Sequence, residues 1–206
     1  MTSLKYILQH KIVAILRGLS AADVINIATS LHEGGINIIE VTLNSNDALS
    51  LIKKLSYTFE NKMLVGAGTV LTVKDARLAI DAGAQFLISP TLDTDIIKTA
   101  KDNSVVSIPG AYTPTEIFTA YKNGADIIKI FPAQSPGYVK QILAPLDKVL
   151  VMPTGGIDIN NIEAYKKAGA SAFGIGSSLV SNKEKVDELY LQNLTAKASR
   201  FVEAIK

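Results

Sequence analysis

Lys129 is the residue whose type and surroundings most directly suggest chemistry. It lies between Ile128 and Ile130 in the segment "GADIIKIFPAQSPG", residues 124–137, and this apolar run is typical of a buried strand. An ammonium group taken out of water is costly unless it is paired or loses its proton. Either the ammonium group reaches solvent at the edge of the strand, or the lysine is buried because a neutral amine is needed for a reaction.

A glutamate on another strand is expected to approach this lysine. Side chains alternate along a strand, so Ile39, Val41 and Leu43 share a wholly apolar face that should pack against helices. The opposite face of the same segment should point to the interior. It carries Ile36, Ile38, Glu40, Thr42 and Asn44.

The same alternation predicts that an arginine joins the pair. Lys129 and Phe131 share the inward face of their strand, and Arg17 has the parity of Val13 and Ile15 in the first strand. A lysine, a glutamate and an arginine then converge on the interior. Two structural alternatives stay open: the glutamate and lysine could form a buried ion pair without function, and the arginine could cap a helix.

Two glycine-rich segments, "PTGGI" and "GIGSSLV", follow the last two expected strands. Backbone N–H groups of such loops, next to a helix N-terminus, are typical of a phosphate site. Simple tight turns are the structural alternative. The candidate phosphate-binding residues are Thr154, Gly155, Gly156, Gly176, Ser177 and Ser178.

These residue types together indicate one kind of reaction. A lysine in an apolar environment near an arginine favours its neutral amine, which attacks a carbonyl and forms a Schiff base. A neighbouring carboxylate can then move protons as a general acid and base. An arginine suits the carboxylate of a 2-oxo acid, and a phosphate site suits a phosphorylated tail. The sequence therefore predicts metal-free carbon–carbon cleavage of a phosphorylated 2-oxo acid, with Lys129 as the nucleophile and Glu40 as the acid/base.

A repeated strand–helix pattern must position these residues. Glycine follows a helical stretch and precedes an apolar run at Gly35, Gly83, Gly124 and Gly169, which is the pattern of a left-handed helix C-cap followed by a strand. Intermediate apolar runs lie between these four. The expected strands fall within residues 11–18, 33–42, 63–70, 81–90, 105–110, 122–131, 149–156 and 167–176. Thr69 and Pro90, at the ends of the third and fourth, are further candidates to contact a substrate.

Eight strands that alternate with helices predict an α/β fold, namely a compact (β/α)8 TIM barrel of about 26 residues per unit. The alternative is an open doubly wound sheet, although no GxGxxG motif follows the first strand. Residues 1–11 should form a short helix that closes the bottom of the barrel. No linker or low-complexity segment interrupts residues 1–206, so a single domain is expected.

Composition excludes several classes of function. The chain has no cysteine and only two histidines, His10 and His32, so a disulfide scaffold, thiol catalysis and a zinc site are not expected. The net charge of +2 without a basic run gives no indication of nucleic-acid binding or of an anionic membrane. No apolar run reaches membrane-spanning length, and the N-terminus has no signal-peptide pattern. We expect a cytoplasmic protein without metal or other cofactor.

Seven motifs, in order and at barrel spacing, give the chain a family resemblance over roughly residues 12–180. They are "IEVTL", "VGAGTV", "ISP", "IPG", "KIFPA", "PTGGI" and "GIGSSLV". On these motifs the chain resembles the 2-keto-3-deoxy-6-phosphogluconate (KDPG) aldolases, a class I family that also acts on 4-hydroxy-2-oxoglutarate (KHG). The resemblance implies a homotrimer. It also implies cleavage of KDPG to pyruvate and D-glyceraldehyde 3-phosphate, and of KHG to pyruvate and glyoxylate.

The resemblance also implies roles for individual residues. Lys129 corresponds to the Schiff-base lysine and Glu40 to the general acid/base. Thr69 and Phe131 belong to the pyruvate pocket, while the "TGG" and "GIGSS" segments form the phosphate end. Many members carry an arginine where this chain has Asn44, four residues after the glutamate.

The Asn44 departure leaves the substrate open between two sugars. Together with "AILRG", the "LNS" segment is similar to the branch that cleaves 2-keto-3-deoxy-6-phosphogalactonate (KDPGal), whereas "PTGG" and "SSLV" favour the phosphogluconate branch, which we prefer. Two rival functions use the same fold: a phosphosugar isomerase or epimerase, and a non-catalytic phosphosugar-binding barrel.

Overall fold

In a computed structural model that describes residues 2–206, strands and helices alternate along the chain. The strands are β1 (Ile12–Leu16), β2 (Ile38–Thr42), β3 (Leu64–Gly68), β4 (Phe86–Ile88), β5 (Val106–Ile108), β6 (Gly110–Ala111), β7 (Ile128–Ile130), β8 (Val151–Pro153) and β9 (Phe173–Ile175). The helices are α1 (Ser3–His10), α2 (Val24–Glu33), α3 (Ala48–Thr58), α4 (Val73–Asp81), α5 (Thr94–Asp102), α6 (Pro114–Lys122), α7 (Pro136–Leu143), α8 (Ile162–Lys167) and α9 (Glu188–Ala204).

The strands form a curled parallel sheet in two parts. One part has the order β5-β4-β3-β2-β1-β9 and the other the order β6-β7-β8. The two parts are linked by hydrogen bonds from Asp126 N, just before β7, to Ser107 O of β5 (3.0 Å) and from Ser171 N, just before β9, to Val151 O of β8 (2.9 Å), and by a bridge between Thr154 and Gly174. Because β1 pairs with both β2 and β9, the first and last strands are neighbours, without the order reversal of a doubly wound sheet.

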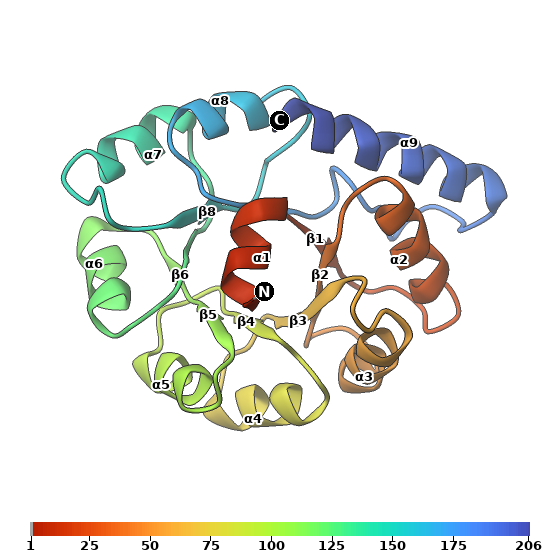
Figure 1. The fold of residues 1–206 in the computed structure, drawn as a ribbon, viewed down its shortest axis with the longest axis horizontal. Helices are drawn as coiled ribbons and strands as arrows, with labels where there is room; N and C mark the ends of the chain where they lie inside the picture. Colours follow the sequence, from red (N-terminus) through yellow and green to blue (C-terminus); the bar gives the residue numbers. More distant parts are fainter. Residues whose placement is uncertain (1) are drawn as a thin grey trace.

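Helices surround the strands, as Figure 1 shows in the view down the short axis, and α1 lies across the centre of this ring. The chain leaves α1 and enters β1 two residues later, so α1 covers the end where strands begin. Ile7 of α1 is fully buried among interior side chains of the strands. The expected N-terminal helix therefore closes this end, although it covers Ser3–His10 rather than residues 1–11.

The sequence explains where most helices begin and end. Thr113 caps α6 in a capping box with Glu116. The side chain of Thr113 accepts a hydrogen bond from the backbone N–H of Glu116, and the side chain of Glu116 accepts one from the backbone N–H of Thr113. All four glycines expected after helices have positive φ angles between 88° and 102°: Gly35, Gly83, Gly124 and Gly169. Left-handed backbone favours glycine, so these C-cap predictions are confirmed.

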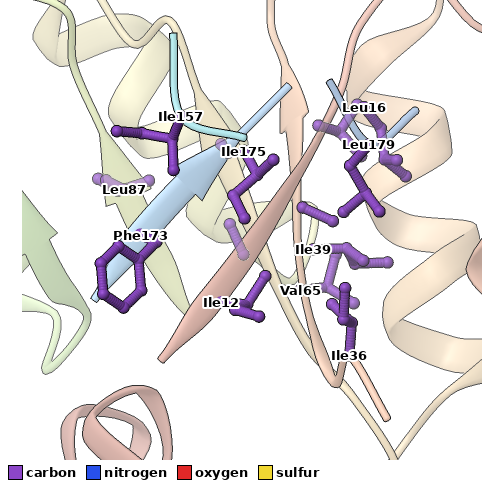
Figure 2. Packing of buried hydrophobic residues seen from close by; sticks show 14 of the residues in the cluster. Ile12, Leu16, Ile36, Ile39, Val65, Leu87, Ile157, Phe173, Ile175 and Leu179 are labelled. Atoms are coloured by element: carbon purple, nitrogen blue, oxygen red, sulfur yellow. The ribbon is translucent and has the colours of Figure 1, made fainter. Parts of the chain in front are cut away.

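Two hydrophobic clusters fill the molecule. The larger one lies between the strands and the helices, and Figure 2 shows part of it, with Ile12, Ile39 and Val65 gathered beside the strands. The smaller one fills the interior near α1. It comprises Ile7, Val13, Ile38, Leu64, Phe86, Ile88, Val106, Ile108, Ile127, Met152 and Ala172. Ile38 and Ile39 belong to different clusters, as the alternation in β2 predicts.

The structure corrects the sequence analysis at the ends of elements. Ile36 precedes β2 and packs with the helix-facing cluster, not the interior. Asn44 is exposed in a turn after β2 ends at Thr42, so strand alternation does not apply to it. The helix expected at Gly176 is one turn, in which the N–H groups of Leu179 and Val180 donate to Gly176 O.

Among residues 2–206, no helix combines the length and apolar character that a membrane span requires.

Candidate active site

Lys129 is 5 % exposed in the middle of β7, between Ile128 and Ile130, which face the helices. Its Nζ lies 4.8 Å from the centre of the Phe131 ring. Burial lowers the pKa of the Lys129 ammonium group below its ordinary value, Arg17 lowers it further, and Glu40 partly opposes the shift. The alternative of a lysine that reaches solvent is therefore wrong, and the lowered pKa makes the neutral amine more accessible than in an exposed lysine.

Glu40 is buried in β2, with 1 % of its surface exposed. Of the buried side-chain nitrogen and oxygen atoms in residues 2–206, Glu40 Oε2 alone has no hydrogen-bond partner. Burial raises the pKa of the Glu40 carboxyl, while Lys129 and Arg17 lower it. A carboxyl group whose pKa is raised holds its proton more readily than an exposed glutamate does, which suits a general acid/base.

The carboxyl group of Glu40 lies against the backbone of β3. A Cβ atom on Gly68 would come within 1.5 Å of Glu40 Oε1, a distance that no side chain at residue 68 allows. Thr42 and Gly68 are directly paired across β2 and β3. Gly68 therefore leaves the space in which the glutamate side chain lies.

A cavity of about 300 Å³ opens beside Lys129 at the ends of the strands. It brings together residues from strands far apart in the sequence. The lining residues that the sequence analysis singled out are Arg17, Lys129, Phe131, Thr154, Gly155, Gly156, Gly176, Ser177 and Ser178. Glu40 is not among the lining residues. It is paired across β1 and β2 with Ile15, which lines the cavity.

The charged groups of this site are not joined in ion pairs. The ion pairs within 4.0 Å in the described chain join Lys98 to Asp102, Lys101 to Asp126, Lys167 to Glu163 and Lys206 to Glu203. Neither Glu40 nor Lys129 takes part, so a structural ion pair does not explain their burial. Arg17, just beyond β1, is exposed and lines the cavity.

The glycine-rich segments after β8 and β9 form one side of the cavity. Gly155 and Gly156 have φ angles of +91° and +72°, which orient successive peptide groups in a way that side-chain-bearing residues rarely allow. The hydroxyl of Ser178 donates to Ile157 O and so ties the two segments together. Ser177 is exposed in the cavity lining. Ser177 is thus the serine whose hydroxyl is free to meet a ligand.

Three expected substrate-binding residues do not line this cavity. Asn44 lies in the exposed turn after β2, and Pro90 packs its backbone where a Cβ atom on Gly110 would be, 2.4 Å away. Thr69 follows β3 with a φ angle of +56°, an unusual value for a β-branched residue. Such strain is often found at functional sites.

The structure also adds residues that the sequence analysis missed. The cavity is further lined by Ile15, Ile157, Asp158, Gly174, Val180 and Asn182. Strand alternation could have identified Gly174, which precedes Gly176 by two residues in the same strand end. Asn182 has no such signal, because it lies in an irregular segment before α9.

Comparison with protein families gives a match over nearly the whole chain. Residues 4–195 match the model of the KDPG and KHG aldolase family. Over 198 residues the chain is 30 % identical to 2-dehydro-3-deoxy-6-phosphogalactonate aldolase of Escherichia coli K12, covering 95 % of this chain and 94 % of that protein. It is 34 % identical over 182 residues to the KHG/KDPG aldolase of the same organism, covering 87 % and 84 %.

Solved structures have closely similar folds. A native KDPGal structure superposes with a TM-score of 0.88 at 29 % identity, covering 94 % of this chain and 93 % of the other. A KDPG aldolase from Legionella pneumophila, with pyruvate captured at low pH as a covalent carbinolamine intermediate, has a TM-score of 0.80 at 27 % identity and coverages of 99 % and 97 %.

Proposed function

The chain belongs to the KDPG and KHG aldolase family, and from this premise we propose that it is a class I aldolase acting on KDPG. It is an aldolase, a lyase that cleaves a carbon–carbon bond. The proposed products are pyruvate and D-glyceraldehyde 3-phosphate. We further propose cleavage of KHG to pyruvate and glyoxylate, in both cases through a Schiff base on Lys129 and without a metal.

The burial of Lys129 carries this proposal. The residue is 5 % exposed, has no ion-pair partner within 4.0 Å in residues 2–206, and lines a cavity open to a substrate. Burial lowers the pKa of its amine, which makes the neutral, nucleophilic form easier to reach. A purely structural lysine would gain from a salt bridge, which this one lacks.

The first step forms the covalent intermediate. Lys129 Nζ attacks C2 of the 2-oxo acid, and the carbonyl oxygen takes a proton to give a carbinolamine. Loss of water then leaves an iminium ion between the lysine and C2. The Legionella pneumophila relative holds pyruvate as a carbinolamine, which supports this sequence of events by analogy.

In the second step the substrate breaks between C3 and C4. Glu40, as carboxylate, removes the proton of the C4 hydroxyl, the bonding electron pair moves into the iminium, and the aldehyde leaves. The resulting enamine takes a proton at C3 from the Glu40 carboxylic acid. Water then releases pyruvate and restores the amine. The raised pKa of Glu40 suits a group that accepts and returns one proton per cycle.

The two ends of the substrate have separate binding groups in this proposal. Arg17 binds the carboxylate, since a charge-assisted hydrogen bond is about twice as strong as the neutral one that Asn44 can offer. The backbone N–H groups around Gly155 and Gly176, with the hydroxyl of Ser177, bind the phosphate. Thr69 and Pro90 are proposed to contact the pyruvate portion once a substrate is bound.

The architecture and assembly are part of the proposal. The hydrogen bonds that link the two parts of the curled sheet at both edges support a closed (β/α)8 barrel formed by residues 1–206 as one domain. We propose a cytoplasmic homotrimer, as family resemblance implies. Light scattering on the purified protein should then give a mass three times the 22.0 kDa of one chain.

Borohydride trapping tests the proposed mechanism. The protein is incubated with pyruvate and sodium borohydride over a range of pH values, and the intact mass and peptide map are measured. A covalent adduct on Lys129 is expected. Absence of an adduct at every pH would refute the Schiff-base mechanism and favour an isomerase or a binding protein.

KDPGal is the second candidate substrate. Asn44 stands where an arginine is expected in the phosphogluconate type, and the chain is 30 % identical to a KDPGal aldolase over 95 % of its length. Both sugars release pyruvate, so lactate dehydrogenase reports either cleavage. The proposal requires a higher kcat/KM for KDPG, and a higher value for KDPGal would replace it.

A further inference from the structure

The peptide group that joins Arg17 to Gly18 is held on both sides by side chains of other loops. The carbonyl oxygen of Arg17 accepts a hydrogen bond from Asn182 Nδ2 at 3.2 Å. The N–H of Gly18 donates to Ser45 Oγ at 2.9 Å. These partners are 165 and 27 residues away along the chain, so two distant loops fasten one peptide group.

This fastening continues into the strand that carries Glu40. Ser45 Oγ lies 2.9 Å from Thr42 Oγ1, and the N–H of Ser45 donates to Thr42 O at 2.9 Å. Thr42 is fully buried, two residues after Glu40 in β2. The position of the Arg17 backbone is therefore tied to the strand of the proposed acid/base.

The local backbone is shaped for this arrangement. Gly18 has a φ angle of +63°, in the left-handed region that favours glycine. A Cβ atom there would lie 3.1 Å from Asn182 Nδ2, which is closer than ordinary contact. The guanidinium of Arg17 has no ion pair among residues 2–206, so its backbone is fixed while its charged group is free for a ligand.

We infer that Asn182 and Ser45 are positioning residues that hold Arg17 where its guanidinium meets the carboxylate of the 2-oxo acid. This inference rests on the proposed function. Small displacements of a positioning group reduce catalysis strongly, because the reacting carbonyl must face Lys129 in a narrow range of geometries. Asn182 and Ser45 act through Arg17 and are not required for attack on a carbonyl compound that has no carboxylate.

Two trapping substrates separate positioning from general damage. Pyruvate carries a carboxylate, whereas acetaldehyde forms an imine with the same lysine and has none. Asn182→Leu and Ser45→Ala should each raise the half-saturating concentration of pyruvate about fivefold to tenfold, the effect of one net hydrogen bond. Trapping of acetaldehyde should not change. Asn193→Leu, at an exposed asparagine on α9, is the matched control.

A double-mutant cycle and a rescue complete the test. In an Arg17→Leu background, Asn182→Leu should cause no further loss of pyruvate trapping, since the side chain that it positions is gone. Ser45→Thr keeps the hydroxyl and should restore near-normal trapping. Asn182→Ala replaces the leucine variant if thermal unfolding shows that leucine prevents folding.

The outcomes are distinct for the inference and for the proposed function. If the unmodified protein traps pyruvate but both variants behave like it, the positioning inference is wrong. Equal losses with pyruvate and acetaldehyde, or a further loss in the Arg17→Leu background, also overturn it. If the unmodified protein traps neither compound, the proposed function fails, and the inference fails with it.

Discussion

Near α1 the interior face of the strands carries apolar side chains, which form an apolar level. Two residues further along β2 and β7, the same face carries Glu40 and Lys129, which form a charged level. Ile38 precedes Glu40 in β2, and Ile127 precedes Lys129 at β7. The first member of each pair lies in the interior cluster beneath α1. The second lies buried next to a cavity. Alternation alone thus lets one strand contribute both to a core and to a site.

The two levels contribute to stability with opposite signs. A fully buried aliphatic or aromatic side chain stabilises a fold by about 1.5–3 kcal/mol. A buried lysine and a buried glutamate without direct pairing cost free energy instead. The apolar level near α1 therefore offsets the cost of the charged level. Substitutions at the two levels should separate stability from activity.

Lys129→Met should have the largest effect and should separate activity from stability most clearly. Methionine fills the same apolar volume without a charge, so cleavage and borohydride trapping should be lost completely while the free energy of unfolding increases. Intact-mass trapping and urea unfolding measure the two effects. Lys140→Met, at an exposed lysine of α7, is the matched control and should alter neither. Persistent trapping in Lys129→Met would locate the nucleophile at another lysine.

Glu40→Gln should remove proton transfer and leave the shape of the charged level intact. Pyruvate should still form an adduct under forcing conditions. Its methyl protons should exchange with deuterated solvent about 10²–10⁴-fold more slowly, the usual contribution of a single acid/base. Proton NMR of pyruvate gives the exchange rate, with Glu33→Gln on the surface of α2 as control. Undiminished exchange would remove Glu40 from this role.

Phe86→Ala tests the apolar level. Phe86 is fully buried in β4, and its ring occupies the space where a Cβ atom on Gly66 would lie, 2.4 Å away. Loss of the ring should lower the free energy of unfolding by about 3–5 kcal/mol. Folded protein should still trap pyruvate. Phe118→Ala, at a 44 % exposed phenylalanine, should cost much less. Equal losses of stability would contradict the stabilising role assigned to the apolar level.

Strand alternation predicted much of this site, and it worked where strands are continuous. It correctly predicted that Glu40 and Lys129 point inward, because both lie within regular strands. It failed at Ile36 and Asn44, where the chain lies outside β2 and the period of two no longer applies. Helix C-caps were predictable because a left-handed residue after a helix strongly favours glycine.

The remaining features depend on contacts between distant loops. The bond from Asn182 to Arg17 joins residues 165 positions apart, and no local pattern announces it. The space that Gly68 leaves for Glu40 likewise depends on how β2 and β3 are registered. Because glycine in a strand can indicate a bulge, a turn or a close approach, the sequence alone did not distinguish these meanings.

The pH dependence of imine formation tests how Glu40 and Arg17 act on the pKa of Lys129. Since the neutral amine reacts and the pKa of Lys129 is lowered, acetaldehyde trapping with cyanoborohydride should level off below pH 10.5. Glu40 raises this pKa and Arg17 lowers it. The plateau should therefore begin at lower pH in Glu40→Gln and at higher pH in Arg17→Leu. Shifts in the opposite directions would contradict the assigned interactions.

The smallest effect is expected at the end closed by α1. Asn37 Nδ2 can only donate, so His10 Nδ1, 3.3 Å away, must accept and carry no proton. Asn37 Oδ1 in turn accepts from His32 Nδ1 at 2.6 Å. Burial lowers the pKa of His10 below its ordinary 6.5. Protonation of His10 would break the bond from Asn37 that helps to hold α1.

The sign of the resulting pH effect follows from linkage. Because the pKa of His10 is lower in the folded chain, the unfolded chain takes up the proton first as the pH falls. The stabilising contribution is complete above about pH 6.5 and is lost as the pH falls through the folded pKa. The thermal midpoint should therefore drop between pH 7.5 and 5 by a few degrees more in the unmodified protein than in His10→Phe, which keeps the ring contact with Tyr6. Parallel pH profiles for the two proteins would mean that α1 is held independently of His10.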